Sequence, residues 1–322
     1  MYNKNVLILG GAGFIGSNLV EKFINYRYDV TVIDGLLEKT GGCLQNISKI
    51  LNKITFIEKK IEEVQNLSKI ISKHDIIIDS MAWTSHLSAL KNPMYDLELN
   101  VKSHLYFLEE INKSRSKANK VIYLGSRGQY GNPKVDVINE TIPMIPEDIQ
   151  GIHKLTAENY YRIYSKIHGL NIISLRIPNC FGENQPYECN DIGLVGSFIR
   201  DSLKNKTIEI YGKGRKRNLI YIRDLTDIVY RLSNTSFSGF SSFNIAGYET
   251  TIKDLVTAII TITNKGNFIL KKIPEEIKNI DTGFARYDDT KLKSILENFN
   301  LTKFEKAIEN TINYCIQRIK NN

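Results

Sequence analysis

Four glycines near the amino end have the spacing of a phosphate-binding turn. In the run VLILGGAGFIGS, Gly11, Gly13 and Gly16 fit the pattern G-x-G-x-x-G. Gly10 together with the last two fits the tighter G-x-x-G-x-x-G. Backbone without side chains can turn sharply and approach a pyrophosphate, and the free N–H groups at the start of a helix then bind the anion. The spacing therefore indicates a site for a phosphorylated ligand.

The elements around this turn are those that a dinucleotide site needs. A buried strand is predicted over 5–9, an amphipathic helix over 15–26, and a second strand over 30–34 that ends in Asp34. An acidic residue at this point accepts hydrogen bonds from the hydroxyls of an adenosine ribose and repels a 2′-phosphate. The pattern predicts NAD rather than NADP.

Short β-branched runs alternate with longer amphipathic stretches through the first half of the chain. These runs barely alternate between polar and apolar residues, as is typical of strands buried on both faces. The order predicts an α/β fold with a doubly wound parallel sheet, the Rossmann arrangement. The predicted strands are 5–9, 30–34, 54–57, 75–79, 120–124 and 171–175, and the predicted helices are 15–26, 95–112 and 153–168.

After residue 176 the chain becomes richer in loops. Helical patterns continue at 193–205, 225–234, 252–263 and 304–319, but there is too little strand for an independent sheet protein. We therefore expect an NAD-binding Rossmann domain over 1–176 and a smaller substrate-binding lobe over 177–322. Some late segments are expected to return to the first domain.

Charge and cysteine content exclude several classes of partner. The 322-residue chain has a net charge of +8, but its lysines are dispersed. Binding to nucleic acid needs such charge on one face, so we expect no nucleic-acid partner. Cys43, Cys180, Cys189 and Cys315 lie far apart with no histidine at ligand spacing, which predicts no metal site. No apolar stretch is long enough for a membrane span, and the expected location is the cytoplasm.

Seven segments, taken in order, carry a resemblance to a known family. They are Gly10–Gly16, Asp79–Pro93, Asn100, Ser126–Gly131, Gln150–Glu158, Leu175–Gly182 and Arg217–Asp224. Together they resemble the extended short-chain dehydrogenase/reductase superfamily, and within it the nucleotide-sugar epimerases and dehydratases. The resemblance spans essentially the full length. It implies NAD as cofactor and a nucleoside-diphosphate sugar as substrate.

The catalytic motif of this superfamily is incomplete here. Its members typically carry Ser or Thr on one loop and Y-x-x-x-K on a following helix, which move a proton off a sugar hydroxyl while hydride goes to NAD. Ser126 and Lys154 fall on the expected positions, but the tyrosine position is Gln150. An amide has no proton to exchange near neutral pH. The resemblance implies that Ser126 bonds the reacting oxygen, Lys154 holds the nicotinamide ribose, and Gln150 only positions the substrate.

Two histidines are candidates for the missing base. His86 belongs to a loop that faces the nicotinamide and the hexose in similar enzymes, where an imidazole could take the proton at physiological pH. Alternatively, His86 contacts the substrate and helps to select it, or it stabilises its own loop. His153, which precedes Lys154, is interpreted as a helix-surface residue. The general base is therefore left open.

The residues after Ser126 argue against one reaction of the family. Similar 4,6-dehydratases place an Asp-Glu pair there, where this sequence reads Arg127-Gly128. Without a carboxylate to take the C5 proton or to protonate the leaving C6 hydroxyl, 4,6-dehydration is not expected.

The resemblance also implies contacts for both ligands. Asn179 and Arg217 are expected at the diphosphate of the sugar nucleotide, where an arginine can form two parallel hydrogen bonds. His86 and Ser126 are expected at the sugar. The expected cofactor contacts are Gly10, Gly13, Phe14, Ile15, Gly16, Asp34, Ile61, Ala82, Asn100 and Lys154.

Three functions remain after these steps. The leading one is an NAD-dependent nucleotide-sugar epimerase that transiently oxidises C4 of a hexose. The alternatives are a dehydrogenase or 4-ketoreductase with net redox, and a silent homologue that binds NAD and sugar nucleotide without turnover.

Helices over 100–112 and 153–168 carry apolar residues on more than one face. Because similar enzymes pair these helices across a two-fold axis, we expect a homodimer joined by a four-helix bundle.

Overall fold

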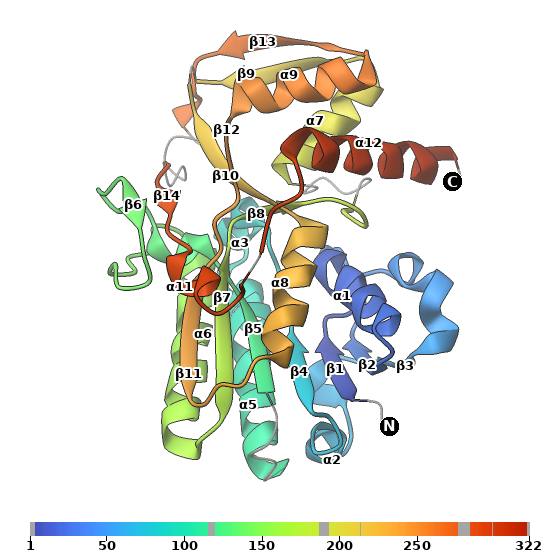
Figure 1. Ribbon diagram of the computed structural model, residues 1–322, viewed down its shortest axis with the longest axis vertical. Helices are drawn as coiled ribbons and strands as arrows, with labels where there is room; N and C mark the ends of the chain where they lie inside the picture. The colour runs from blue at the N-terminus through green and yellow to red at the C-terminus, as the bar shows by residue number, and fades with distance from the viewer. Residues whose placement is uncertain are drawn as a thin grey trace.

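A parallel sheet forms the larger part of the molecule (Figure 1). The computed structural model describes residues 4–114, 120–186, 193–212, 214–275, 284–297 and 299–320. Within them a seven-stranded sheet has the order β11-β7-β5-β4-β1-β2-β3. Its strands are β1 (Asn5–Leu9), β2 (Asp29–Asp34), β3 (Thr55–Glu58), β4 (Ile76–Asp79), β5 (Lys120–Ser126), β7 (Asn171–Ile177) and β11 (Phe240–Asn244). The prediction of a doubly wound α/β fold is confirmed.

Helices cover both faces of this sheet, which explains why its strands lack polar alternation. Val6 and Ile8 of β1 enter one core with α1 (Phe14–Asn25) and α8 (Ile222–Asn234). Leu7 and Leu9 enter the opposite core with α2 (Leu67–Ile71), α5 (Ser103–Ser114) and α6 (Ile149–His168). Successive side chains of a strand point to opposite faces, so both sets are buried.

Two predicted helices differ from those observed. The one expected over 95–112 consists of α4 (Pro93–Leu97), a π-helical turn (Glu98–Lys102) and α5. The one expected from residue 153 begins at Ile149, because the Asp148 side chain accepts the Gly151 N–H and caps it. The earlier start adds a turn of helix that carries Gln150 and Gly151.

The second half of the chain contains more strand than the sequence predicts. Most of these strands are short, and outside the seven-stranded sheet they pair as β12-β10-β8, β13-β9 and β14-β6, the last with a strand of the first half. The remaining strands and α-helices of the described residues are β6 (Val137–Ile138), α3 (His86–Lys91), β8 (Asn179–Phe181), α7 (Leu194–Leu203), β9 (Thr207–Tyr211), β10 (Lys216–Tyr221), β12 (Tyr248–Thr251), α9 (Ile252–Thr263), β13 (Asn267–Lys271), β14 (Arg286–Tyr287), α11 (Thr290–Lys293) and α12 (Phe304–Lys320).

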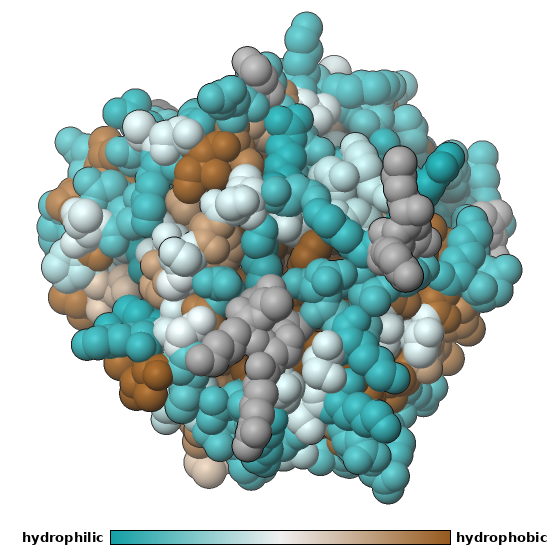
Figure 2. Space-filling model, turned by 60° about the horizontal axis from the view of Figure 1, so that its bottom comes forward, coloured by the Kyte–Doolittle hydropathy of each residue, from teal (hydrophilic) through white to brown (hydrophobic). Residues whose placement is uncertain are grey.

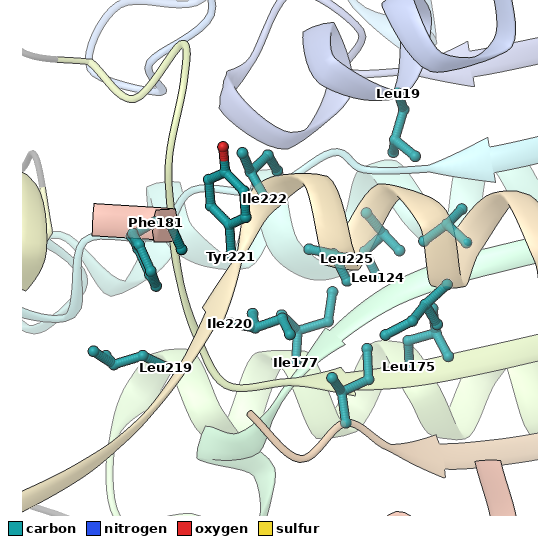
Figure 3. Close-up of a cluster of buried hydrophobic side chains, with 14 of the residues drawn as sticks. Leu19, Leu124, Leu175, Ile177, Phe181, Leu219, Ile220, Tyr221, Ile222 and Leu225 are labelled. Atoms are coloured by element: carbon teal, nitrogen blue, oxygen red, sulfur yellow. The ribbon is translucent and has the colours of Figure 1, made fainter. Parts of the chain in front are cut away.

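One hydrophobic core connects the sheet with the smaller lobe above it in Figure 1. Figure 3 shows Leu124 and Leu175 of the sheet near Leu225 of α8, with Ile220 of β10 continuing the cluster. The chain enters the lobe after β7 and returns through α8 to β11, which pairs in parallel with β7. The lobe is therefore held firmly over one end of the sheet.

The opposite end of the molecule is a mainly hydrophilic surface. Figure 2 brings this end forward and shows its hydrophobic residues in small, separate areas. Among the described residues, no helix combines the length and apolarity that crossing a membrane requires.

Candidate active site

A cleft of about 810 Å³ lies at the carboxyl ends of the strands, where the sheet meets the smaller lobe. This is the edge at which open parallel sheets bind their ligands. Of the predicted site residues, Asn100 alone is not part of its lining. The cleft walls include Gly10, Gly13, Phe14, Ile15, Gly16, Asp34, Ile61, Ala82, His86, Ser126, Gln150, Lys154, Asn179 and Arg217.

The glycine turn brings the start of α1 to the floor of the cleft. Gly10 has a φ of +73°, which favours glycine, and a Cβ on Gly16 would lie 2.1 Å from the Gly10 carbonyl oxygen. Both glycines are thus required for the helix to begin so close to β1. Gly13 supplies no side-chain cap, so the first N–H groups of α1 point toward the cleft without one. The turn fits a pyrophosphate.

Asp34 lies beside this turn at the end of β2. Its carboxylate accepts the N–H groups of Ala12 at 2.9 Å and Leu36 at 2.8 Å. Burial raises the pKa of its carboxyl, while these two hydrogen bonds favour the ionised form. Together with Phe14 and Ile61 it offers the polar and apolar groups that an adenosine requires, so the residues present fit NAD.

Asn100 was predicted at the cofactor and instead lies behind the cleft wall. It is fully buried in the π-helical turn, donates to the Trp83 carbonyl at 2.8 Å and to Asp96 at 2.9 Å, and accepts the Trp83 N–H at 3.0 Å. With both ends of its amide used in this way, Asn100 holds the loop that carries Ala82 into the cleft.

Ser126 ends β5 and presents its hydroxyl to the cleft. Its N–H donates to Gln129 at 2.8 Å, and its Oγ accepts the Gly128 N–H at 3.1 Å. The hydroxyl hydrogen remains available to a ligand oxygen. The short turn from Ser126 to Gly128 therefore fixes where that hydrogen bond is offered.

Lys154 approaches the cleft from α6 and is 3% exposed. Its Nζ lies 3.5 Å from the Leu124 carbonyl oxygen and 5.3 Å from the centre of the Tyr123 ring. Burial lowers the pKa of Lys154 to about 8, against the charges of Asp79 and Asp96, which favour the protonated form. The ammonium thus retains donors for a ligand in a largely dry position.

Gln150 lies one helical turn before Lys154 and also lines the cleft. Its Nε2 donates to the Trp83 carbonyl at 3.0 Å. The amide therefore fixes the same loop that Asn100 holds. It has no group that exchanges a proton near neutral pH.

His86 faces the cleft from the start of α3, and its side chain is 44% exposed. Its Nδ1 lies 2.8 Å from Asp148 Oδ2, whereas the other Asp148 oxygen accepts the Gly151 N–H at 2.6 Å. Burial favours the neutral carboxyl, but the hydrogen bond and charge of His86 and the Gly151 N–H hold the pKa of Asp148 below its usual range.

Asp148 was not predicted as a site residue, because the helix was expected to begin only at His153. The signal that could have found it was an N-cap residue type directly before the helix. His153 is not at the helix surface as predicted. Its Nδ1 lies 2.5 Å from the buried Asp96, and it does not line the cleft.

Arginines from both parts of the molecule line the far end of the cleft. Arg127 donates to Asn179 of β8 at 2.9 Å, and β8 pairs with β10, which carries Arg217. Arg215 also lines this end. Neither Arg127 nor Arg215 was predicted as a site residue. The three guanidinium groups suit an anionic ligand such as a diphosphate.

The chain is similar in sequence to a known protein family and to one named relative. Residues 6–246 match the family described as the NAD dependent epimerase/dehydratase family. A CDP-paratose 2-epimerase of Salmonella typhi is 27% identical over 308 residues, which cover 87% of this chain and 86% of that protein.

Two solved structures cover nearly the whole chain. The UDP-glucose 4-epimerase of Thermotoga maritima, solved with UDP-glucose, has a TM-score of 0.86 and 27% identity, over 98% of this chain and 99% of that one. The UDP-N-acetylglucosamine 4-epimerase of Methanobrevibacter ruminantium, in complex with UDP-N-acetylmuramic acid, has a TM-score of 0.88 and 25% identity, over 99% and 100%.

Proposed function

The chain belongs to the NAD dependent epimerase/dehydratase family, and from this premise we propose that it is a nucleotide-sugar epimerase. The substrate class is a nucleoside-diphosphate hexose, and the reaction is transient oxidation at C4 followed by return of the hydrogen to either face. The names of the similar solved structures, two 4-epimerases of UDP sugars, support this assignment.

The observation that carries the proposal is the grouping of Ser126 and Lys154 with the glycine turn around one cleft. The turn at Gly10–Gly16 and Asp34 would hold the pyrophosphate and the adenosine ribose of NAD, and Lys154 its nicotinamide ribose. When bound, NAD accepts a hydride from a carbinol carbon and gives it back. Ser126 would donate to the oxygen of that carbon and so fix its distance from the lysine.

The far end of the cleft supports a sugar nucleotide as substrate. Asn179 and Arg217 would bind its diphosphate, and Arg127 would hold Asn179 in place through their 2.9 Å hydrogen bond. Arg127 and Gly128 also stand where a 4,6-dehydratase needs acid and base, so the proposal excludes dehydration. The division into an NAD-binding part over 1–176 and a substrate-binding part over 177–322 agrees with these assignments.

The decisive experiment incubates the purified protein and NAD with UDP, dTDP, CDP and GDP hexoses. Formation of the C4 epimer by NMR, without lasting NADH absorbance, is the expected result. Lasting NADH would instead identify a net oxidoreductase. Binding of NAD and sugar nucleotide with no product would identify a silent homologue, the alternative that Gln150 favours.

A Gln150→Tyr variant separates the last two cases further. A silent homologue gains activity when the tyrosine is restored, whereas an enzyme with a rearranged base loses it, because the Gln150 amide that fixes Trp83 is gone. Loss of turnover is our expectation.

We also propose that the protein is a homodimer through α5 and α6. Ile152, Ile163 and Ile167 are exposed on one face of α6, at helical spacing, and Ile167 is 67% exposed. On α5, however, Phe107, Leu108 and Ile111 are used by the core. Light scattering of the wild type should give twice the mass of one chain. The Ile163→Asp variant should give the mass of a single chain. A monomeric wild type contradicts this proposal.

A further inference from the structure

The site described above has no proton-exchanging group at the tyrosine position, and the structure assigns that role to His86. We propose that His86 Nε2 takes the proton of the hydroxyl that is oxidised and returns it when the carbonyl is reduced, with Asp148 as its positioning residue. This inference rests on the proposed function, because it names the acid and base of the same reaction.

The hydrogen bond at Nδ1 sets the tautomer of the imidazole. Asp148 is 5% exposed at its side chain and is held by the Gly151 N–H, so its ionised carboxylate accepts from His86 Nδ1–H. The lone pair of the neutral ring then lies on Nε2. Among the described residues, Nε2 has no hydrogen-bond partner, and the ring lines the cleft.

Two glycines bring this imidazole close to Ser126. A Cβ on Gly128 would lie 3.4 Å from Ser126 Oγ and 4.0 Å from His86 Cε1, so both groups border the same small space. A Cβ on Gly151 would lie only 2.7 Å from the Gly128 carbonyl oxygen. The close approach of these glycines allows the start of α6, and with it Asp148, to reach the serine turn.

Proton balance requires such a group. Oxidation of a carbinol to a carbonyl removes one hydride from carbon and one proton from oxygen. Bound NAD would supply an acceptor for the hydride alone, so the proton would pass to His86 Nε2 and the imidazole would become imidazolium. Reduction from the other face returns both, and the enzyme ends as it began. The Asp148 carboxylate stabilises the imidazolium that forms in between.

The titratable groups that share the cleft lining with His86 come from several neighbouring elements. Asp148 lies at the cap of α6 and Lys154 farther along that helix, Arg127 lies in the turn after β5, and Tyr95, Glu98 and Lys102 lie in α4 and the π-helical turn that follows it. Of these groups, Asp148 is in direct contact with His86, with its Oδ2 2.8 Å from Nδ1.

Two other histidine–aspartate pairs show that pairing alone does not make a proton acceptor. His104 contacts Asp79 at 2.7 Å with both side chains fully buried, and His153 contacts Asp96 at 2.5 Å. Neither histidine lines the cleft. His86 is thus the histidine among the described residues that combines a carboxylate at one nitrogen with access to the substrate at the other.

The first test measures kcat and its pH dependence for His86→Gln. We expect kcat to fall by about 100-fold or more, the usual contribution of a general acid–base group, with KM changed less than about 3-fold. The acidic limb of the wild-type profile should disappear. The matched control, His153→Gln, removes a paired histidine outside the cleft and should retain the acidic limb.

The second test uses Asp148→Asn, which keeps a good helix cap but removes the charge. The amide introduced at this position can donate a hydrogen bond to His86 Nδ1. The ring hydrogen of His86 would then lie on Nε2, which could no longer accept a proton. We expect kcat to fall about 10-fold or more. In the protein without ligands, the NMR titration midpoint of His86 should move to lower pH, a change that lost packing alone would not produce.

The possible outcomes separate this proposal from the proposed function. A wild type with no epimerase activity overturns the function, while the NMR shift still tests the pairing of His86 with Asp148. An active wild type whose His86→Gln variant keeps kcat within about 3-fold overturns the role of His86. An unchanged titration midpoint in Asp148→Asn overturns the role of Asp148.

Discussion

The interior behind Lys154 and the cleft in front of it contain the same chemical pair in opposite settings. His104 and Asp79 are fully buried, and Asp79 also accepts from the Tyr161 hydroxyl and from the Met81 N–H at 3.0 Å. His86 and Asp148 form a pair of nearly equal length whose ring is open to the cleft. Because the first pair is buried, it stabilises the fold. The ring of the second pair is accessible from the cleft and can therefore exchange a proton.

Breaking the interior pair should have the largest effect on stability. Asp79→Ala leaves His104, Tyr161 and the Met81 N–H without their shared acceptor. We expect a loss of about 3 to 5 kcal/mol in the free energy of unfolding, measured by urea denaturation. The control is Asp288→Ala, which removes a half-buried surface carboxylate whose contact is the Thr290 N–H at 2.9 Å.

The pH dependence of the wild-type free energy of unfolding tests the same comparison. Burial opposes ionisation of Asp79, but His104 and the hydrogen bonds hold its pKa below the usual range. Its contribution to stability is therefore present above the unfolded pKa and is lost as the pH falls through the folded pKa. Asp79→Ala should show less loss of stability on acidification; an equal loss contradicts this account.

Lys154 lies between the two regions and should have an effect of intermediate size and opposite sign. Because burial lowers its pKa to about 8, the charged form destabilises the fold at neutral pH. We expect Lys154→Met to raise the free energy of unfolding at pH 7 by about 1 to 2 kcal/mol and to abolish turnover.

The pH dependence for Lys154 follows with its own sign. Between the folded pKa of about 8 and the ordinary value of 10.5, the unfolded chain binds more protons than the folded one, so wild-type stability should rise. The Lys154→Met variant should lack this rise. Destabilisation of the variant at pH 7 would show that the ammonium stabilises the interior.

Breaking the cleft pair should have the smallest effect on stability. Asp148→Ala removes the cap of α6 and should cost about 1 kcal/mol, whereas Asp148→Asn should cost less because asparagine also caps helices. Thermal denaturation of both variants beside Asp79→Ala provides the comparison. If Asp148→Ala were as costly as Asp79→Ala, the cleft pair would be structural.

Local patterns were sufficient to predict the parallel sheet and the glycine turn. The residues of β1 are apolar on both faces, and those of α1 repeat with a helical period, so neighbouring residues determine both elements. The strands of the smaller lobe were not predicted, because β8 has only three residues and the partners of β8 and β9 lie far away in the sequence. Periodicity cannot report a pairing between segments far apart in sequence.

The candidate site divides in the same way. Ser126 and Lys154 occupy motif positions, so their place at the cleft could be predicted. The pairing of Asp148 with His86 could not, because it joins residues 62 positions apart and depends on the start of α6. The position of Asn100 within a motif likewise does not reveal that its amide bonds to the backbone of Trp83.

The return of the chain to β11 has a consequence for synthesis on the ribosome. Translation completes β7 well before the residues of α8 and β11 exist, so the growing polypeptide carries an unpaired strand edge and an apolar sheet face. Such surfaces attract other unfinished chains. Protection by a chaperone during this interval would matter more for the yield of this protein than for one whose sheet is built from a continuous stretch of sequence.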